Sequence, residues 1–96
     1  MQIQILNEAE QDLLEGARFY ENQATGLGQY FLDSLFSDID SLQIHSGIHS
    51  KHFGFYRLLS KRFPFAIYYT VENNLTQVLA VLDCRQNPET LKGRLS

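Results

Sequence analysis

The chain has 96 residues, of which 44% are hydrophobic and 20% are charged, and its formal net charge is −3. This length provides for one compact domain over residues 1–96, and the composition excludes a disordered or fibrous chain. The single cysteine, Cys84, excludes an internal disulfide and indicates a reducing compartment, so we expect a cytoplasmic protein in which Cys84 is a small buried hydrophobe. We expect neither a membrane-spanning segment nor a secretory signal.

Charge is distributed unevenly along the chain. Residues 1–50 hold eight acidic side chains against one base, Arg18, whereas residues 51–96 hold seven bases against three acids. Local potential, more than net charge, governs association with a phosphate backbone or an acidic protein. We therefore expect the two halves to face different partners, and the C-terminal half to carry the function.

The first predicted elements are a short strand and a helix. Ile3 and Ile5 alternate with glutamines, which is the period-two pattern of a strand with one buried face. Asn7, followed three residues later by Glu10, predicts a capped helix start, and apolar residues then recur at helical spacing over residues 8–24.

A second helix is predicted after the glycine-containing turn at residues 25–28. An apolar stripe begins at Leu27 and continues to Leu42, and the helix ends before Gly47. Two amphipathic helices joined by a short turn form an antiparallel hairpin. We expect its acidic face in water and its apolar faces against a sheet.

Three strands are predicted in the second half, at residues 53–59, 65–71 and 75–83, because these segments are rich in aromatic and β-branched residues. A two-residue loop at Asn73 and Asn74 places Tyr69 opposite Val78 and Tyr68 opposite Leu79. The expected fold is α+β in the order β-α-α-β-β-β, with an antiparallel three-stranded meander and the helices on one face.

That register also predicts the two faces of the meander. The helices should cover the almost wholly apolar face, formed by Phe65, Ile67, Tyr69, Val71, Val78, Ala80 and Leu82. The open face should carry Ala66, Tyr68, Thr70, Gln77, Leu79, Val81 and Asp83. By the same alternation Arg85 should project to the open side with Tyr68, and the tail after Pro88 has no strong pattern.

With these elements in place, the chain resembles the RelE/ParE superfamily of type II toxin-antitoxin toxins, and in particular ParE-like plasmid stabilisation proteins. The resemblance is carried by KRFPFAIYY at residues 61–69, VLAVL at residues 78–82 and RQNP at residues 85–88, together with the order of elements. It extends over nearly the whole chain, from the opening strand and EAEQDL at residues 8–13 to LKGRL at residues 91–95.

The resemblance implies a toxin expressed beside a labile antitoxin, which neutralises it by wrapping an extended or helical segment over the sheet and helices. Two toxic mechanisms occur in the superfamily. RelE-like members are ribosome-dependent endoribonucleases that use basic residues and commonly a C-terminal tyrosine, whereas ParE-like members inhibit DNA gyrase without known catalysis.

The basic residues and the tail of this chain favour gyrase inhibition over RNA cleavage. For a ribonuclease, Arg57, Lys61 and Arg85 would hold the scissile phosphate and its developing charge. Arginine is a poor general base, however, and the tail after Arg85 contains neither tyrosine nor histidine. The bases are also few for docking on ribosomal RNA. We therefore expect no catalysis and a protein target such as gyrase, with the ribonuclease as the alternative and a non-toxic antitoxin-binding operon regulator as a third possibility.

We expect partners to bind the open sheet face and the tail, and no membrane or small-molecule substrate to be involved. The residues expected to bind a partner are Arg57, Lys61, Arg62, Tyr68, Arg85, Pro88 and Arg94. Lys61 and Arg62 could instead form a solvated hairpin loop, and Asp83 could simply pair with Arg57 or Arg85.

Two other clusters are interpreted as structural. His45, His49 and His52 have helical spacing, but Gly47 interrupts that helix, so we expect an exposed loop and no metal site. The acids Glu8, Asp12 and Glu15 are expected to form a solvated helix face. No cofactor is expected.

Overall fold

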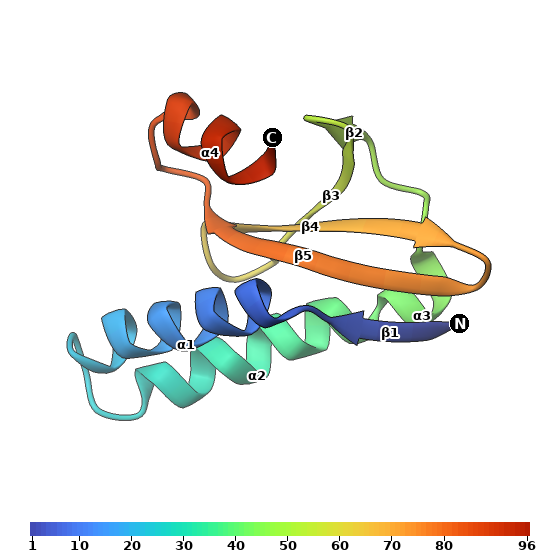
Figure 1. The fold of residues 1–96 in the computed structure, drawn as a ribbon. Coiled ribbons are helices and arrows are strands. Elements are labelled where there is room, and N and C mark those ends of the chain that lie inside the picture. The colour runs from blue at the N-terminus through green and yellow to red at the C-terminus, as the bar shows by residue number, and fades with distance from the viewer.

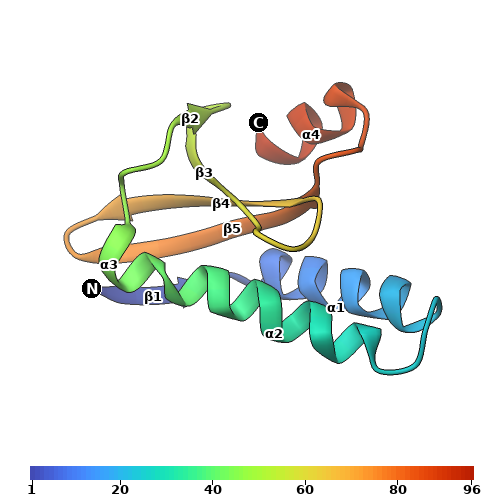
Figure 2. The same ribbon diagram turned by 180° about the vertical axis from the view of Figure 1, so that it is seen from behind.

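The computed structural model describes all residues from Met1 to Ser96 and is a two-sided α+β fold, with a sheet between a helical hairpin and a C-terminal helix (Figures 1 and 2). In chain order its elements are β1 (Gln2–Ile5), α1 (Asn7–Glu21), α2 (Leu27–Asp40), α3 (Leu42–His45), β2 (Lys51–His52), β3 (Phe55–Leu59), β4 (Phe65–Glu72), β5 (Leu75–Asp83) and α4 (Pro88–Leu95). No helix is long and apolar enough to cross a membrane.

The predicted helical hairpin is confirmed, but its ends differ from expectation. Asn7 is the first helical residue and makes no side-chain cap. α1 ends at Glu21 rather than at residue 24, because the Glu21 carboxylate accepts hydrogen bonds from Gly26 N and Gly28 N at the start of α2. Gly26 takes a left-handed conformation (φ 89°) there, which glycine adopts without strain. The second helix also stops at Asp40, and the short α3 follows it.

The sheet has five strands in the order β1-β5-β4-β3-β2. The antiparallel meander β3-β4-β5 is confirmed, while β1 pairs in parallel with β5 and makes the sheet mixed. The predicted strand at residues 53–59 begins only at Phe55. Phe53 and Gly54 both have positive φ, which makes them the turn after a strand that the sequence did not predict, β2.

The predicted loop at Asn73 and Asn74 is confirmed, and so is the pairing of Tyr69 with Val78. The pairing of Tyr68 with Leu79 is wrong, because a β-bulge leaves Leu79 as an extra residue and Tyr68 faces Ala80. A bulge inserts one residue into one strand and reverses the alternation beyond it. Val81 therefore belongs to the hairpin side, and Ala80 and Leu82 belong to the other side, opposite to the prediction.

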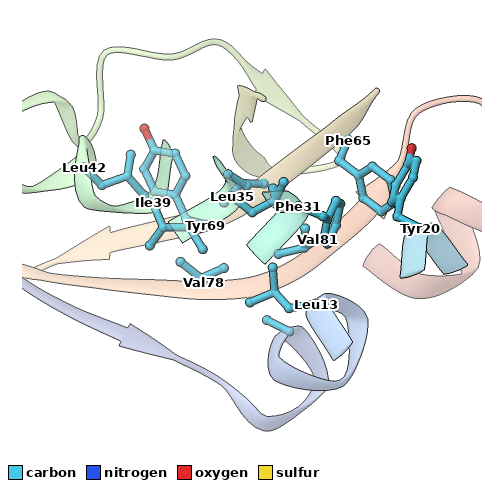
Figure 3. Close-up of a cluster of buried hydrophobic side chains, with 12 residues drawn as sticks. Leu13, Tyr20, Phe31, Leu35, Ile39, Leu42, Phe65, Tyr69, Val78 and Val81 are labelled. Atoms are coloured by element: carbon cyan, nitrogen blue, oxygen red, sulfur yellow. The ribbon is translucent and has the colours of Figure 1, made fainter. Parts of the chain in front are cut away.

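The main core lies between the helical hairpin and the sheet (Figure 3). Aromatic rings dominate it: Phe31 packs against Tyr20, Phe63 and Phe65 at centroid distances of 5.3, 5.0 and 4.9 Å. Its fully buried members include Phe31, Leu35, Leu42, Ile67, Tyr69 and Val78. The face predicted to receive the helices does so, apart from the residues that the bulge displaces.

A second, smaller core lies on the opposite face, under α4. It contains Ala66, Tyr68, Ala80, Leu82 and Leu95, with Phe55 and Leu91 packed against it. The tail after Pro88, which lacks a strong sequence pattern, is thus a helix that covers the face expected to be open. Asn87 caps this helix by accepting a hydrogen bond from Glu89 N, and Pro88 occupies the first turn, where proline fits.

Candidate partner-binding surface

Basic residues from two connections meet at one end of the sheet. The β3–β4 connection carries Lys61 and Arg62, and the chain after β5 carries Arg85. Cys84 N donates a hydrogen bond to Pro64 O at 2.8 Å, which holds the two connections side by side. We call the group Arg57, Lys61, Arg62 and Arg85 the basic end of the sheet.

A buried acid anchors the β3–β4 connection to the helical hairpin. Asp38 on α2 is 6% exposed, and its Oδ2 accepts a hydrogen bond from Ser60 Oγ at 2.7 Å and a longer one from Lys61 N at 3.4 Å. The Lys61 and Arg62 side chains, by contrast, are exposed and form no ion pair. The backbone of this loop is therefore fixed while its two charges remain available.

Arg85 is engaged within its own turn. It forms two side-chain hydrogen bonds to the Asp83 carboxylate, of 2.9 and 2.7 Å, and its backbone N donates a third of 2.8 Å. The Arg85 hydrogen bonds hold the pKa of Asp83 below its usual value, and Asp83 raises the pKa of Arg85. Of the two roles considered for Arg85, binding a partner or pairing with Asp83, the structure shows the pairing with Asp83.

The prediction that Arg85 shares a face with Tyr68 is wrong. Asp83 pairs with Phe65, a residue of the hairpin-side core, and Tyr20 of α1 is close enough to Arg85 to raise its pKa further. The bulge at Leu79 is the reason, because it shifts every later residue of β5 by one step.

Arg94 ties α4 to α1. Its two terminal nitrogens donate to Asp12 at 2.8 and 2.9 Å, and Glu8 lies 3.7 Å away. Asp12 is 7% exposed and also accepts a hydrogen bond from Val81 N, so the interpretation of the Glu8, Asp12 and Glu15 cluster as a solvated face is wrong for Asp12. These hydrogen bonds to Asp12 raise the pKa of Arg94.

Tyr68 and Arg57 lie opposite each other on adjacent strands, on the side of the sheet that α4 covers. Tyr68 is only 2% exposed, since the second core encloses it. The Arg57 side chain forms no ion pair and lies near Cys84. Cys84 itself is exposed, contrary to expectation, although partial burial of its thiol raises its pKa.

Sequence reasoning missed a polar cluster at the opposite end of the sheet. The hydroxyl of the buried Tyr69 lies 2.5 Å from His49 Nδ1 and accepts a hydrogen bond from Gly47 N. Burial lowers the pKa of His49, with His45 contributing. His49 therefore anchors the α3–β2 connection instead of decorating an exposed loop, and no three His, Cys, Asp or Glu side chains lie close enough together to hold a metal.

This arrangement, a helical hairpin on one face of a mixed sheet with a basic end, defines a class of small α+β proteins. One solved structure, described as the chromosomal ParDE TA system from P. aeruginosa, shares the fold with a TM-score of 0.69 and 18% sequence identity, over 84% of this chain and 92% of that one. A sequence profile described as the ParE toxin of the type II toxin-antitoxin system, parDE, matches residues 3–88. No curated protein matches the sequence significantly.

The chain belongs to the ParE toxin family. It is a ParE-type toxin of a type II toxin-antitoxin system, and the resemblance stated from its sequence is confirmed.

Proposed function

We propose that this ParE-type toxin arrests growth in the cytoplasm by binding an essential protein, DNA gyrase being the leading candidate, and that a cognate antitoxin neutralises it. The observation that carries the proposal is the basic end of the sheet, where Arg57, Lys61 and Arg62 form no ion pair in a chain whose net charge is −3. Lys61 and Arg62 are exposed and Arg57 is half-buried. Unpaired cations on an otherwise acidic protein direct association toward an acidic partner surface.

The chemistry around these cations supports binding over RNA cleavage. General acid-base catalysis requires a titratable group within hydrogen-bond reach of the reacting atoms. Near Arg57, Cys84 has a raised pKa and Tyr68 is enclosed in the second core, so neither is suited to exchange a proton with a bound nucleotide. Arg85, the main candidate for stabilising a phosphate, is already held by Asp83.

Supercoiling assays with purified toxin and purified gyrase test the target. We expect the wild type to inhibit supercoiling, and the triple variant Arg57→Ala/Lys61→Ala/Arg62→Ala to inhibit it at least about tenfold less strongly. Lys92→Ala, which removes an exposed base on α4, is the matched control and should inhibit as the wild type does. Unchanged supercoiling at toxin concentrations that arrest growth would remove gyrase as the target.

Growth and transcript measurements separate the other two possibilities. Inducible expression without antitoxin should arrest growth while translated messages stay intact. Codon-phased cleavage of those messages, abolished by Arg85→Ala, would instead establish the ribosome-dependent ribonuclease. Normal growth at full expression would point to a non-toxic operon regulator that binds the antitoxin.

A further inference from the structure

The middle of the α3–β2 connection is held to the sheet by hydrogen bonds to one side chain. Residues 47–49 belong to neither core, and Ile48 among them is 71% exposed. Their hydrogen bonds to the sheet all go to the hydroxyl of Tyr69, which lies 3.0 Å from Gly47 N and 2.5 Å from His49 Nδ1. The Tyr69 ring itself is part of the main core (Figure 3). A segment with so few contacts opens locally at low cost.

The Tyr69 hydroxyl determines where the proton of His49 lies. Tyr69 is 0% exposed, so its hydroxyl hydrogen must have an acceptor inside the protein. Gly47 N–H is a donor, which leaves His49 Nδ1 as the acceptor within hydrogen-bond distance. His49 is therefore neutral in this arrangement, with its hydrogen on Nε2.

A proton on His49 Nδ1 would remove that acceptor. An imidazolium donates from both of its nitrogens, so the Tyr69 hydroxyl would have two donors as neighbours, Nδ1–H and Gly47 N–H, and no acceptor. A buried polar hydrogen without a partner is costly. Water satisfies it only if residues 47–49 move away from Tyr69.

The groups that face His49 do not compensate a positive charge. They are His45 of α3, Tyr69 of β4 and Tyr56 of β3, whose ring stacks on Tyr69 at 5.2 Å; Lys51 of β2 lies over the Tyr56 ring at 4.9 Å. Strand β1, which α3 contacts, contains no ionisable side chain. None of these groups is a carboxylate, and burial, with a contribution from His45, lowers the pKa of His49 from 6.5.

Both ends of the connection have attachments that do not involve His49. At one end Ser46 Oγ lies 2.6 Å from the hydroxyl oxygen of the uncharged Thr76 on β5. At the other end Ser50 O accepts a hydrogen bond of 3.0 Å from Arg57 N of β3. Residues 47–49 can therefore detach while the flanking elements stay in place.

We propose that the α3–β2 connection is a pH-sensitive switch, in which a solvent proton taken up by His49 Nδ1 releases residues 47–49 from Tyr69. Because the pKa of His49 is lowered in the folded state, the closed form is stabilised above the ordinary value of 6.5, and this stabilisation is lost as the pH falls through the lower folded value. The switch lies at the opposite end of the sheet from the basic end, so it does not depend on the proposed target.

Hydrogen exchange of the Gly47 amide in the purified toxin tests the switch. We expect its protection factor, which corrects for the intrinsic effect of pH on exchange, to fall by at least about tenfold between about pH 8 and pH 5. The Cys84 amide, which donates to Pro64 O at the basic end, is the internal control and should stay equally protected. Nitrogen NMR of the imidazole should show His49 Nδ1 without a proton at about pH 8.

Three substitutions identify the titrating group. His49→Asn places an amide oxygen near the position of Nδ1, where it accepts the Tyr69 hydrogen without titrating, so Gly47 should stay protected at both pH values. His52→Asn is the matched control and should keep the pH dependence of the wild type. His45→Asn should move the transition to higher pH, because His45 lowers the pKa of His49.

Several results would overturn the switch. Equal protection of Gly47 at both pH values in the wild type is one, and a pH dependence that survives in His49→Asn is another. A proton found on His49 Nδ1 at about pH 8 would contradict the hydrogen-bond arrangement itself. Parallel loss of protection at Gly47 and Cys84 would show unfolding of the whole chain instead of local release.

Discussion

At the scale of single residues, two buried carboxylates determine where the connections lie. Asp38 holds the β3–β4 loop, and Asp12 joins three elements, since it accepts Val81 N from β5 and two donors from Arg94 on α4. β1 pairs with β5 only as far as Val78, so Val81 has no strand on that side. Asp12 replaces the missing strand as hydrogen-bond acceptor.

Removing Asp12 should therefore be costly. We expect Asp12→Ala to lower the free energy of unfolding by about 2–4 kcal/mol, because it leaves Val81 N–H without an acceptor and leaves the Arg94 guanidinium only the more distant Glu8 carboxylate. Glu8→Ala, which removes a more distant and largely exposed carboxylate, should change it by less than about 0.5 kcal/mol. Urea denaturation of both variants and of Arg94→Ala provides the comparison, and equal effects of Asp12→Ala and Glu8→Ala would contradict the assignment.

The ion pair between Asp83 and Arg85 should have a small and pH-dependent effect. The pKa of Asp83 is lowered in the folded state, so its contribution to stability is present above the ordinary aspartate value of 3.8 and is lost as the pH falls through the lower folded value. Because the Arg85 side chain is 59% exposed, solvent screening keeps this contribution small. Asp83→Asn should be less stable than the wild type at pH 7, and the difference should shrink as the pH falls below 3.8. A difference that persisted unchanged at pH 2 would have another origin.

At the scale of elements, two glycines in helices have opposite roles. A Cβ on Gly16 of α1 would lie 2.6 Å from the Phe31 ring, whereas a Cβ on Gly93 of α4 would meet no atom within 4 Å. The first glycine allows α1 and α2 to approach closely. The second has no packing role.

The same substitution should thus have opposite effects at the two sites. Gly16→Ala should destabilise the protein by about 1–3 kcal/mol through overpacking, despite the better helix propensity of alanine. Gly93→Ala should stabilise it by about 0.5–1 kcal/mol, since only propensity changes. Thermal melts of the two variants are the measurement. A stabilised Gly16→Ala would show that α1 and α2 can accommodate the added methyl group without strain.

The bulge in β5 is the element-scale feature that divides the two cores. Deleting Leu79 should restore strict alternation, with Val78 and Val81 kept on the hairpin side and Ala80 and Leu82 kept under α4. We expect a folded protein that is less stable by about 1–2 kcal/mol, from the loss of one half-buried leucine.

Deletion of Thr70 is the control for that experiment. Thr70 is also half-buried, but it lies in the regular part of β4, so its loss moves Val71 away from the hairpin-side core. It should cost more than deletion of Leu79 in urea denaturation. The reverse order would contradict the face assignment.

At the scale of the whole molecule, the sheet has a core on each side, and only one of them depends on the C-terminal helix. The hairpin-side core has 12 buried residues, and the α4-side core has five. The smaller core encloses Tyr68, so α4 decides whether this tyrosine is available to a partner.

A chain shortened to residues 1–87 tests this division. It should still fold on the larger core but be less stable by about 3–5 kcal/mol, because it loses the burial of Leu91 and Leu95 and the Arg94–Asp12 pair. Urea denaturation followed by tyrosine fluorescence would measure the change. An unaltered midpoint would mean that α4 is not bound to the sheet in solution.

The sequence by itself determined the elements with strong local signals. The alternation of Ile3 and Ile5, the apolar stripes of the two helices and the Asn73–Asn74 turn depend only on neighbouring residues, and the structure confirms each of them. The family resemblance followed from the same segments. These features are encoded by neighbouring residues, so the sequence of this single chain was enough to predict them.

Only the tertiary structure decided the faces of β5 and the coverage of the sheet. One extra residue at Leu79 reversed the alternation that places Arg85, and no local pattern marks it because Val78–Leu82 is uniformly apolar. The pairing of Asp12 with Arg94 joins positions 82 residues apart, and it is this contact that brings α4 over Tyr68. Such long-range contacts leave no periodic trace in the sequence, because either partner alone looks like an ordinary surface charge.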